Sequence, residues 1–333
     1  MSEQDDVGPA QALVEQGLEH HQAGELVPAG RCYATAIEID PEHADAHNLL
    51  GLARLQVGDT EGAVASIDRA VALRPEIAQY HVSLGKARQG NADLEGAVAA
   101  FEAALRLDPE LVEAHNDLGN ALLARGDAQR AIASFEAALE VDPDYHLAGA
   151  NLANTLHGQG RFREAERCYH RLLEQEPGNV AWLGALALVL GESERYAEAI
   201  EQCERARLLT PEDPVLAQRL LYFAAIDGSW VEHRAALTRL DAEQRAELAE
   251  VLEGRGLVGR RRRAVVRSPG PEGQRAASTG VGSRTRTRSA GSRPTSSPRR
   301  PALMYRRGSA AIDACMQTGS GLRVPNGLMP PTW

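Results

Sequence analysis

The sequence predicts an all-α protein built from a repeated pair of helices, and three observations support this prediction. Apolar residues recur at intervals of three and four, which is the period of an amphipathic helix. The body of the chain is rich in Ala, Leu and Glu, and aromatic residues make up only 4% of the whole, a composition typical of helical domains. Six prolines recur at one fixed interval along the chain: Pro41, Pro75, Pro109, Pro143, Pro177 and Pro211.

Each 34-residue interval is predicted to form two helices joined by a turn. In residues 112–145, a Gly-Asp pair interrupts the apolar pattern once and an Asp-Pro pair ends the unit. Proline cannot continue the preceding helix but suits the first turn of the next, and Asp before it can cap that turn. Gly119 is expected to let the two helices approach closely, with Phe135 filling the space beside it. After an extension of residues 1–9, we therefore expect six repeats: 10–43, 44–77, 78–111, 112–145, 146–179 and 180–213.

Residues 214–254 are predicted to close the array. Residues 214–227 look like the first helix of a degenerate seventh repeat, and a degenerate second helix follows. Asp241 is a plausible N-cap of a strongly charged final helix, which ends near Gly254. We expect such a cap because the terminal unit of a repeat array needs a polar outer face.

Residues 255–333 differ sharply from the body in charge. From Gly254 to Trp333 there are 16 Arg, no Lys and two acidic residues, a net charge of +14, whereas Met1 to Glu253 carries −24. Gly, Ser, Pro, Thr and Arg dominate without periodicity, so we expect disorder. Three interpretations stay open: a basic tail that binds nucleic acid or an acidic surface, an inert terminus, or an out-of-frame product in place of a lost C-terminal domain.

Motifs that carry chemistry are scarce. The four cysteines show no CxxC spacing, which argues against a structural zinc site or a disulfide framework. His47, His81 and His115 recur at one repeat position, where packing accounts for them, and the His43–His47 pair has no obvious third metal ligand. No GxSxG, HExxH or phosphate-binding glycine loop is present. We therefore expect no enzyme activity, no cofactor and no metal.

The N-terminal sequence MSEQDDVGPA lacks the apolar core of a signal peptide. No stretch reaches the ~18 apolar residues that a membrane-spanning helix needs. We therefore expect a cytoplasmic protein that has no membrane partner.

The repeat unit resembles that of the tetratricopeptide repeat family, which has small and bulky residues at these places. The small series is Gly17, Gly51, Gly85 and Gly119, and the bulky series is Tyr33, Ile67, Phe101, Phe135, Tyr169 and Cys203. The resemblance covers residues 10–213. It implies a right-handed superhelical solenoid in which the first helix of each repeat lines a concave groove.

On that geometry, amide side chains are expected to gather in the groove, four apart on one helix and three apart on the next. An Asn side chain can donate to and accept from a peptide backbone at once, and one amide layer per repeat suits an extended peptide. Towards the N-terminus leucines would suit an apolar segment of the ligand. The alternative is that the amides merely keep this face soluble. The predicted groove residues are Asn48, Leu49, Leu52, Lys86, Asn116, Asp117, Asn120, Asn151 and Asn154.

Two subfamily resemblances bear on the ligand. Chaperone-binding members clamp a C-terminal carboxylate with cations beside an Asn pair that Asn120 and Asn151 match. Here Asn116, Ala181 and Ala185 stand at the cation positions, which argues against a clamp. The O-linked N-acetylglucosamine transferases carry an Asn ladder in the groove, and Asn151 matches one of its positions.

We interpret the chain as a non-catalytic interaction scaffold that binds a protein or peptide ligand in the groove. One alternative is the substrate-recognition arm of a glycosyltransferase- or sulfotransferase-type enzyme whose catalytic domain is absent or frameshifted. Another is a nucleic-acid binder that acts only through residues 255–333, because the acidic body would repel phosphate.

Overall fold

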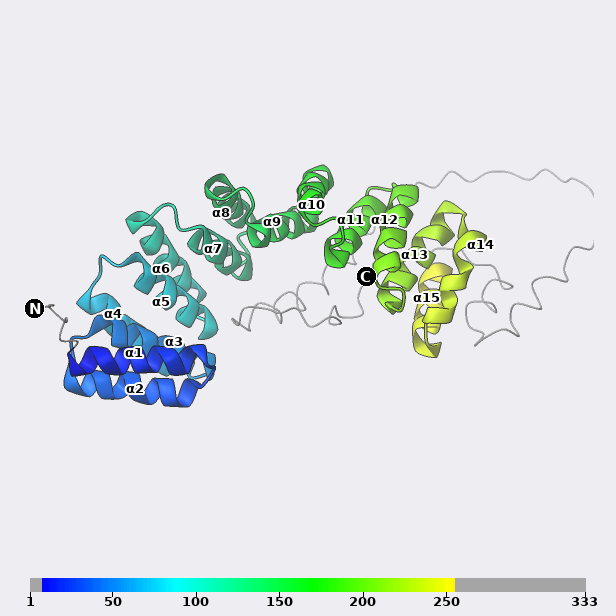
Figure 1. The fold of residues 1–333 in the computed structure, drawn as a ribbon. Helices are drawn as coiled ribbons and strands as arrows, with labels where there is room; N and C mark the ends of the chain where they lie inside the picture. The colour runs from blue at the N-terminus through cyan, green and yellow to red at the C-terminus, as the bar shows by residue number, and fades with distance from the viewer. Residues whose placement is uncertain (1–7, 255–333) are drawn as a thin grey trace, which may run out of the picture. The chain divides into compact units, whose positions relative to one another are not determined.

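The computed structural model describes residues 8–254, and every regular element in that range is a helix, which confirms the all-α prediction (Figure 1). The described residues form two units, 8–151 and 152–254, with the boundary inside α9. The predictions for residues 1–7 and for the basic segment 255–333 lie outside the described residues. The paired helices are α1 (Pro9–Gln22), α2 (Leu26–Ile39), α3 (Ala44–Gln56), α4 (Thr60–Leu73), α5 (Ala78–Gly90), α6 (Leu94–Leu107), α7 (Val112–Ala124), α8 (Ala128–Val141), α9 (His146–Gly158), α10 (Phe162–Gln175), α11 (Val180–Glu192) and α12 (Tyr196–Leu209).

Aspartates cap several turns, but one part of the sequence prediction is wrong: the Asp-Pro pairs lie in the turn before the next helix and not in its first turn, because α3 begins at Ala44 and α7 at Val112. Asp40 Oδ1 accepts a hydrogen bond from the backbone N–H of Glu42 at 3.0 Å, and Asp108 and Asp142 make the same bond at the same length. Helices α4, α6 and α8 each follow an Asp whose carboxylate accepts a backbone N–H three residues later. The bonds before α4, α6 and α8 satisfy donors that a helix start otherwise leaves unpaired, whereas the bonds of Asp40, Asp108 and Asp142 stabilise the turns themselves.

The recurring histidines fasten helices to the turns before them. The Nε2 atoms of His47, His81 and His115 lie 3.0, 2.8 and 2.9 Å from the carbonyl oxygen of the proline six residues earlier. A hydrogen bond to the turn thus accounts for the recurrence, where the sequence suggested packing alone. Among residues 8–254, no group of three His, Cys, Asp or Glu side chains could hold a metal ion.

Within a helix pair of the first unit, a glycine allows the closest approach. A Cβ added to Gly119 of α7 would lie 2.7 Å from Cδ1 and Cζ of Phe135 on α8, and closer still to Cε1. Phe135 is fully buried, so the contact lies in the core of the pair. This confirms the predicted role of Gly119. The same contact recurs for Gly17 with Tyr33, Gly51 with Ile67, and Gly85 with Phe101.

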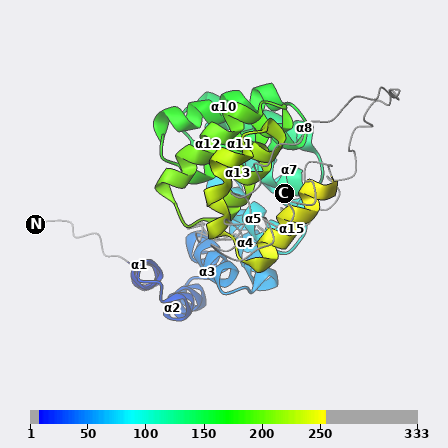
Figure 2. The same ribbon diagram turned by 90° about the vertical axis from the view of Figure 1, so that its right-hand side faces the viewer.

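In the second unit, α11 packs against α10 and α12, and α12 packs against α13 (Pro214–Asp227) (Figure 2). A regular second helix does not follow α13. Its place is taken by the four-residue α14 (Trp230–His233) and a 3₁₀ helix, Arg234–Arg239. The final helix α15 (Ala242–Gly254) contacts α13 and buries Leu248 and Leu252. No helix of the described range is long and apolar enough to cross a membrane.

Candidate peptide-binding surface

Five of the predicted groove residues lie together in the first unit. Lys86 is on α5, Asn116, Asp117 and Asn120 are on α7, and Asn151 is on α9. Each belongs to the first helix of its pair, and α5 and α7 are in direct contact. We call these five residues the ladder surface, because their side chains connect successive helix pairs.

Asn151 links the two amides of α7. Its Nδ2 donates to Asn116 Oδ1 at 2.9 Å and to Asn120 Oδ1 at 3.1 Å. Both amide hydrogens of Asn151 are therefore used inside the protein. Asn116 is only 5% exposed, so its carbonyl depends on that bond. The amide nitrogen of Asn120 makes no hydrogen bond within residues 8–254, and the side chain is half-buried, which leaves two donors available to a ligand.

Lys86 and Asp117 form the corresponding pair one repeat earlier. Lys86 Nζ lies 3.3 Å from Asp117 Oδ2, and both this pair and Asn120–Asn151 join a residue of one repeat to a residue of the next at the same offset. Burial raises the pKa of Asp117, while the Lys86 ammonium and the Asn116 amide, 3.5 Å from Oδ1, act in the opposite direction. The Lys86 side chain is 40% exposed, and an ammonium carries three donors, so it can also donate to a ligand.

Two residues that the sequence did not single out border the ladder surface. Glu113 is exposed on α7, one turn before Asp117. Tyr145 is half-buried directly before α9; burial raises its pKa, and the negative charges of Glu113, Asp117 and Asp142 raise it further. The four-residue spacing of Glu113 and Asp117 is the sequence signal that could have identified this edge.

The remaining predicted residues are not joined to the ladder surface by any hydrogen bond or ion pair of the described residues. Leu49 packs against the core of α1 to α3, and Leu52 is half-buried on α3. Asn154 is exposed in the second unit, where its Oδ1 accepts a hydrogen bond from the Tyr169 hydroxyl at 2.6 Å. Burial leaves Asn48 little surface for a ligand, since it is 7% exposed.

Asn48 occupies the position of Asn116 in an earlier repeat, but the residue equivalent to Asn151 there is a serine. Asn48 stands two repeats before Asn116, and Ser83 stands two repeats before Asn151, so the two pairs are equivalent. The Ser83 hydroxyl donates to the carbonyl oxygen of Gln79 at 3.0 Å instead. The buried Oδ1 of Asn48 has no hydrogen-bond partner within residues 8–254.

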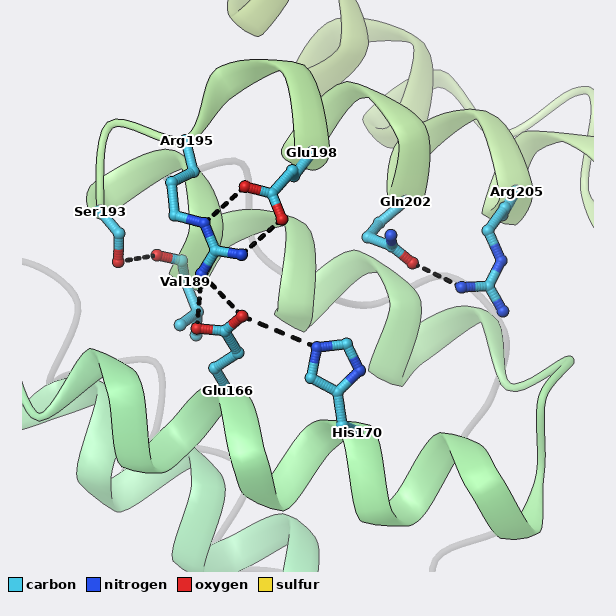
Figure 3. Close-up of polar contacts among 8 residues, drawn as sticks. All are labelled: Glu166, His170, Val189, Ser193, Arg195, Glu198, Gln202 and Arg205. Carbon is cyan, nitrogen blue, oxygen red and sulfur yellow. Dashed lines mark hydrogen bonds and ion pairs between the residues drawn. The ribbon is translucent and has the colours of Figure 1, made fainter.

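A second polar cluster lies between α10 and α12 of the second unit (Figure 3). Nη1 of Arg195 donates to both carboxylate oxygens of Glu166 at 2.7 Å, and its Nε donates to Glu198 at 2.6 Å. These bonds raise the pKa of Arg195 and lower that of Glu198. His170 Nε2 lies 3.7 Å from Glu166. The guanidinium is thus largely engaged in holding α10 to α12, so this cluster is a weaker candidate for ligand binding.

A cavity of about 310 Å³ adjoins that cluster. Of the charged side chains that line it, Arg163 makes no ion pair within residues 8–254 and is exposed. The Ser193 hydroxyl donates to the backbone carbonyl of Val189 at 2.8 Å. The full lining is Gly160, Phe162, Arg163, Glu166, Ser193 and Arg195.

Comparison with known proteins points to a single family. One sequence model described as Tetratricopeptide repeat matches residues 122–189 and 156–222, and a second with the same description matches residues 14–78 and 82–146. No curated protein matches the chain. The solved structure of PilF from Pseudomonas aeruginosa is similar over 65% of this chain and 97% of its own, with 21% identity and a TM-score of 0.54. A tetratricopeptide repeat protein from Parabacteroides merdae is similar over 78% of this chain and 97% of its own, with 18% identity and a TM-score of 0.53.

Proposed function

Because the chain belongs to the tetratricopeptide repeat family, whose fold serves as a protein–protein interaction scaffold, we propose that it is a non-catalytic scaffold that holds an extended peptide segment of a partner protein. The peptide lies across the ladder surface. The observation that carries the proposal is the pair of available donors, the Asn120 amide and the Lys86 ammonium.

The spacing of these two donors suits a peptide backbone. Lys86 and Asn120 occupy the same position in neighbouring repeats, on helices that contact each other. Packed helices lie ~8–10 Å apart, and three residues of an extended chain span about 10 Å. The two donors can therefore bind carbonyl oxygens about three residues apart, whatever the side chains between them.

The ladder fixes the donors in place before a ligand arrives. The Asn151 amide donates a hydrogen bond to the side-chain Oδ1 of Asn120. This bond orients the Asn120 side chain so that its amide nitrogen points away from Asn151. Asp117 similarly holds the Lys86 ammonium. Less side-chain freedom is then lost on binding, and that loss commonly costs about 0.5–1.5 kcal/mol per immobilised side chain.

A peptide selection tests the proposal. The full chain is used to select binders from a displayed library of random 12-residue peptides, and their affinities are measured by fluorescence anisotropy. Asn120→Ala should weaken the best binders about fivefold, equivalent to one hydrogen bond of about 1 kcal/mol. The matched control is Gln129→Ala, which removes an exposed amide from α8 and should leave the affinity unchanged. A library without binders, or binders indifferent to Asn120→Ala, would refute the proposal.

A further inference from the structure

The first unit carries most of the acidic charge of the described chain. Residues 8–151 contain 23 acidic and nine basic residues, a net charge of −14, whereas residues 152–254 contain 18 acidic and 11 basic residues, or −7. A field of this sign raises the local concentration of positively charged ligands and repels negative ones. The ladder surface lies in the more acidic unit.

Close to the ladder surface, Glu113 supplies a negative charge that no cation balances. The Asp117 carboxylate is paired with Lys86 at 3.3 Å, but Glu113 makes no ion pair with any described residue. Some exposed acids of the unit are paired, as Glu102 on α6 is with Arg130 at 2.5 Å, and others such as Glu136 make no ion pair with a described residue; what distinguishes Glu113 is its position beside Asp117 on α7. Glu113 lies one helical turn from Asp117, a spacing that puts Cβ atoms about 5–6 Å apart.

Tyr145, directly before α9, and Leu147, in the first turn of α9, supply aromatic and apolar surface that a basic side chain can contact beyond its charged end. Burial raises the pKa of Tyr145, and the negative charge of Glu113 raises it further. Leu147 stands at the equivalent position of the next repeat and is 61% exposed. An Arg or Lys side chain can lay its alkyl stem on an apolar residue while its charged end contacts a carboxylate and an aromatic face.

We infer that the ladder surface recognises a basic peptide segment of a partner protein, with an Arg or Lys side chain of the peptide bound by Glu113 beside Tyr145 and Leu147. This inference rests on the proposed function. Lys86 and Asn120 bind the peptide backbone irrespective of sequence, and Glu113 supplies the preference for a cation. Acidic peptides are excluded by the same charge.

The same peptide selection tests this inference through its sequence preference. Selected peptides should be enriched in Arg and Lys over Asp and Glu. Glu113→Gln should weaken the best basic peptide about fivefold at low salt. The matched control is Glu136→Gln, which makes the same change in net charge at an exposed site on α8 and should change the affinity less than twofold.

A double-mutant cycle identifies the contact itself. Replacing the critical peptide Arg with citrulline keeps its shape and removes its charge, so it should weaken binding to the wild-type chain about fivefold. The same replacement should have almost no effect on Glu113→Gln. Equal losses in both proteins would show that Glu113 does not bind that side chain.

Three other outcomes would overturn the inference. If the selected peptides depend on Asn120 for binding but are not enriched in Arg and Lys, the inference is refuted and the proposed function stands. A complete absence of peptide binding would remove both. A synthetic peptide of residues 259–275, which includes Arg260 to Arg263, serves as an added probe; if it binds more tightly than every selected peptide, the surface is assigned to the chain's own segment instead of a partner.

Discussion

Gly119→Ala tests the close helix contact on which the repeat packing depends. The added Cβ would lie 2.7 Å from both Cδ1 and Cζ of Phe135, and closer still to Cε1, whereas carbon atoms in good contact are ~3.5–4.0 Å apart. Phe135 is fully buried, so the ring can move only by displacing other core side chains. Such overpacking lowers the free energy of unfolding by about 1–3 kcal/mol. The better helix propensity of Ala offsets about 1 kcal/mol of this loss. We expect a net destabilisation of up to about 2 kcal/mol.

Gly30→Ala is the matched control, because it adds the same methyl group without a clash. Gly30 lies inside α2, and its added Cβ would meet only Leu50 Cδ1 at 3.9 Å. This variant should gain about 0.5–1 kcal/mol. Urea unfolding of the full chain, followed by far-ultraviolet circular dichroism, should therefore move the two midpoints in opposite directions. If Gly119→Ala stabilises the chain as much as Gly30→Ala does, the close packing of α7 on α8 is wrong.

Three further predictions concern the ladder surface and Asn48, the residue equivalent to Asn116 two repeats earlier. Asn48→Leu should stabilise the chain by about 1 kcal/mol, because it removes a buried side-chain carbonyl that has no donor. Asn116→Leu should destabilise it by about 1–2 kcal/mol, because it removes the acceptor of a hydrogen bond from Asn151. Shifts of the two urea midpoints in the same direction would contradict this. Asn151→Ala should cost about 1–3 kcal/mol by leaving the Asn116 carbonyl unpaired, and Asn120→Ala about 1 kcal/mol or less; the reverse order in thermal unfolding would show that the amides do not form this network. Asp117→Asn should be tested by unfolding across a pH series. Burial raises the pKa of Asp117 in the folded chain, so the wild type gains stability as pH falls through that pKa towards the unfolded value. Any stability advantage of the variant should therefore shrink on acidification, and a stability difference that is constant with pH would contradict the raised pKa.

The helix pairs could be predicted from the sequence because their determinants are local. Each helix is determined by the spacing of its apolar residues at three and four, and several turns by an Asp-Pro or Gly-Asp pair. These signals lie inside one repeat, and the 34-residue interval shows where each repeat begins. The contact of Gly119 with Phe135 also lies within one repeat, so a small residue and a bulky residue at fixed spacing were sufficient to predict it. The replacement of a regular second helix after α13 was less predictable, because the apolar pattern there no longer has a clear period.

The connections between repeats could not be predicted in the same way. Asn151 contacts Asn116 and Asn120 of the preceding repeat, and the offsets of these two contacts follow from how one helix pair is shifted against the next. The sequence therefore predicted that the amides lie close together, but not that the Asn151 amide donates both of its hydrogens to Asn116 and Asn120. For the same reason it could not show that Asn154 bonds Tyr169 within the second unit.

The consequence for function is that the amides of the ladder are not equivalent. Asn116 and Asn151 mainly satisfy one another, so their replacement changes stability as well as binding. Asn120 keeps its amide nitrogen available and carries the smaller structural cost. Binding experiments that use Asn120 are therefore easier to interpret than experiments that combine it with Asn151.

The most direct measurement of the central claim is the nuclear magnetic resonance signal of the Asn120 side-chain amide during a peptide titration. The signal is identified in the ¹⁵N-labelled full chain as the amide pair that disappears in Asn120→Ala. The account predicts a saturable shift of this pair, with the dissociation constant found by anisotropy for the same peptide. A peptide that binds while this pair stays unmoved would place the binding site elsewhere and contradict the account.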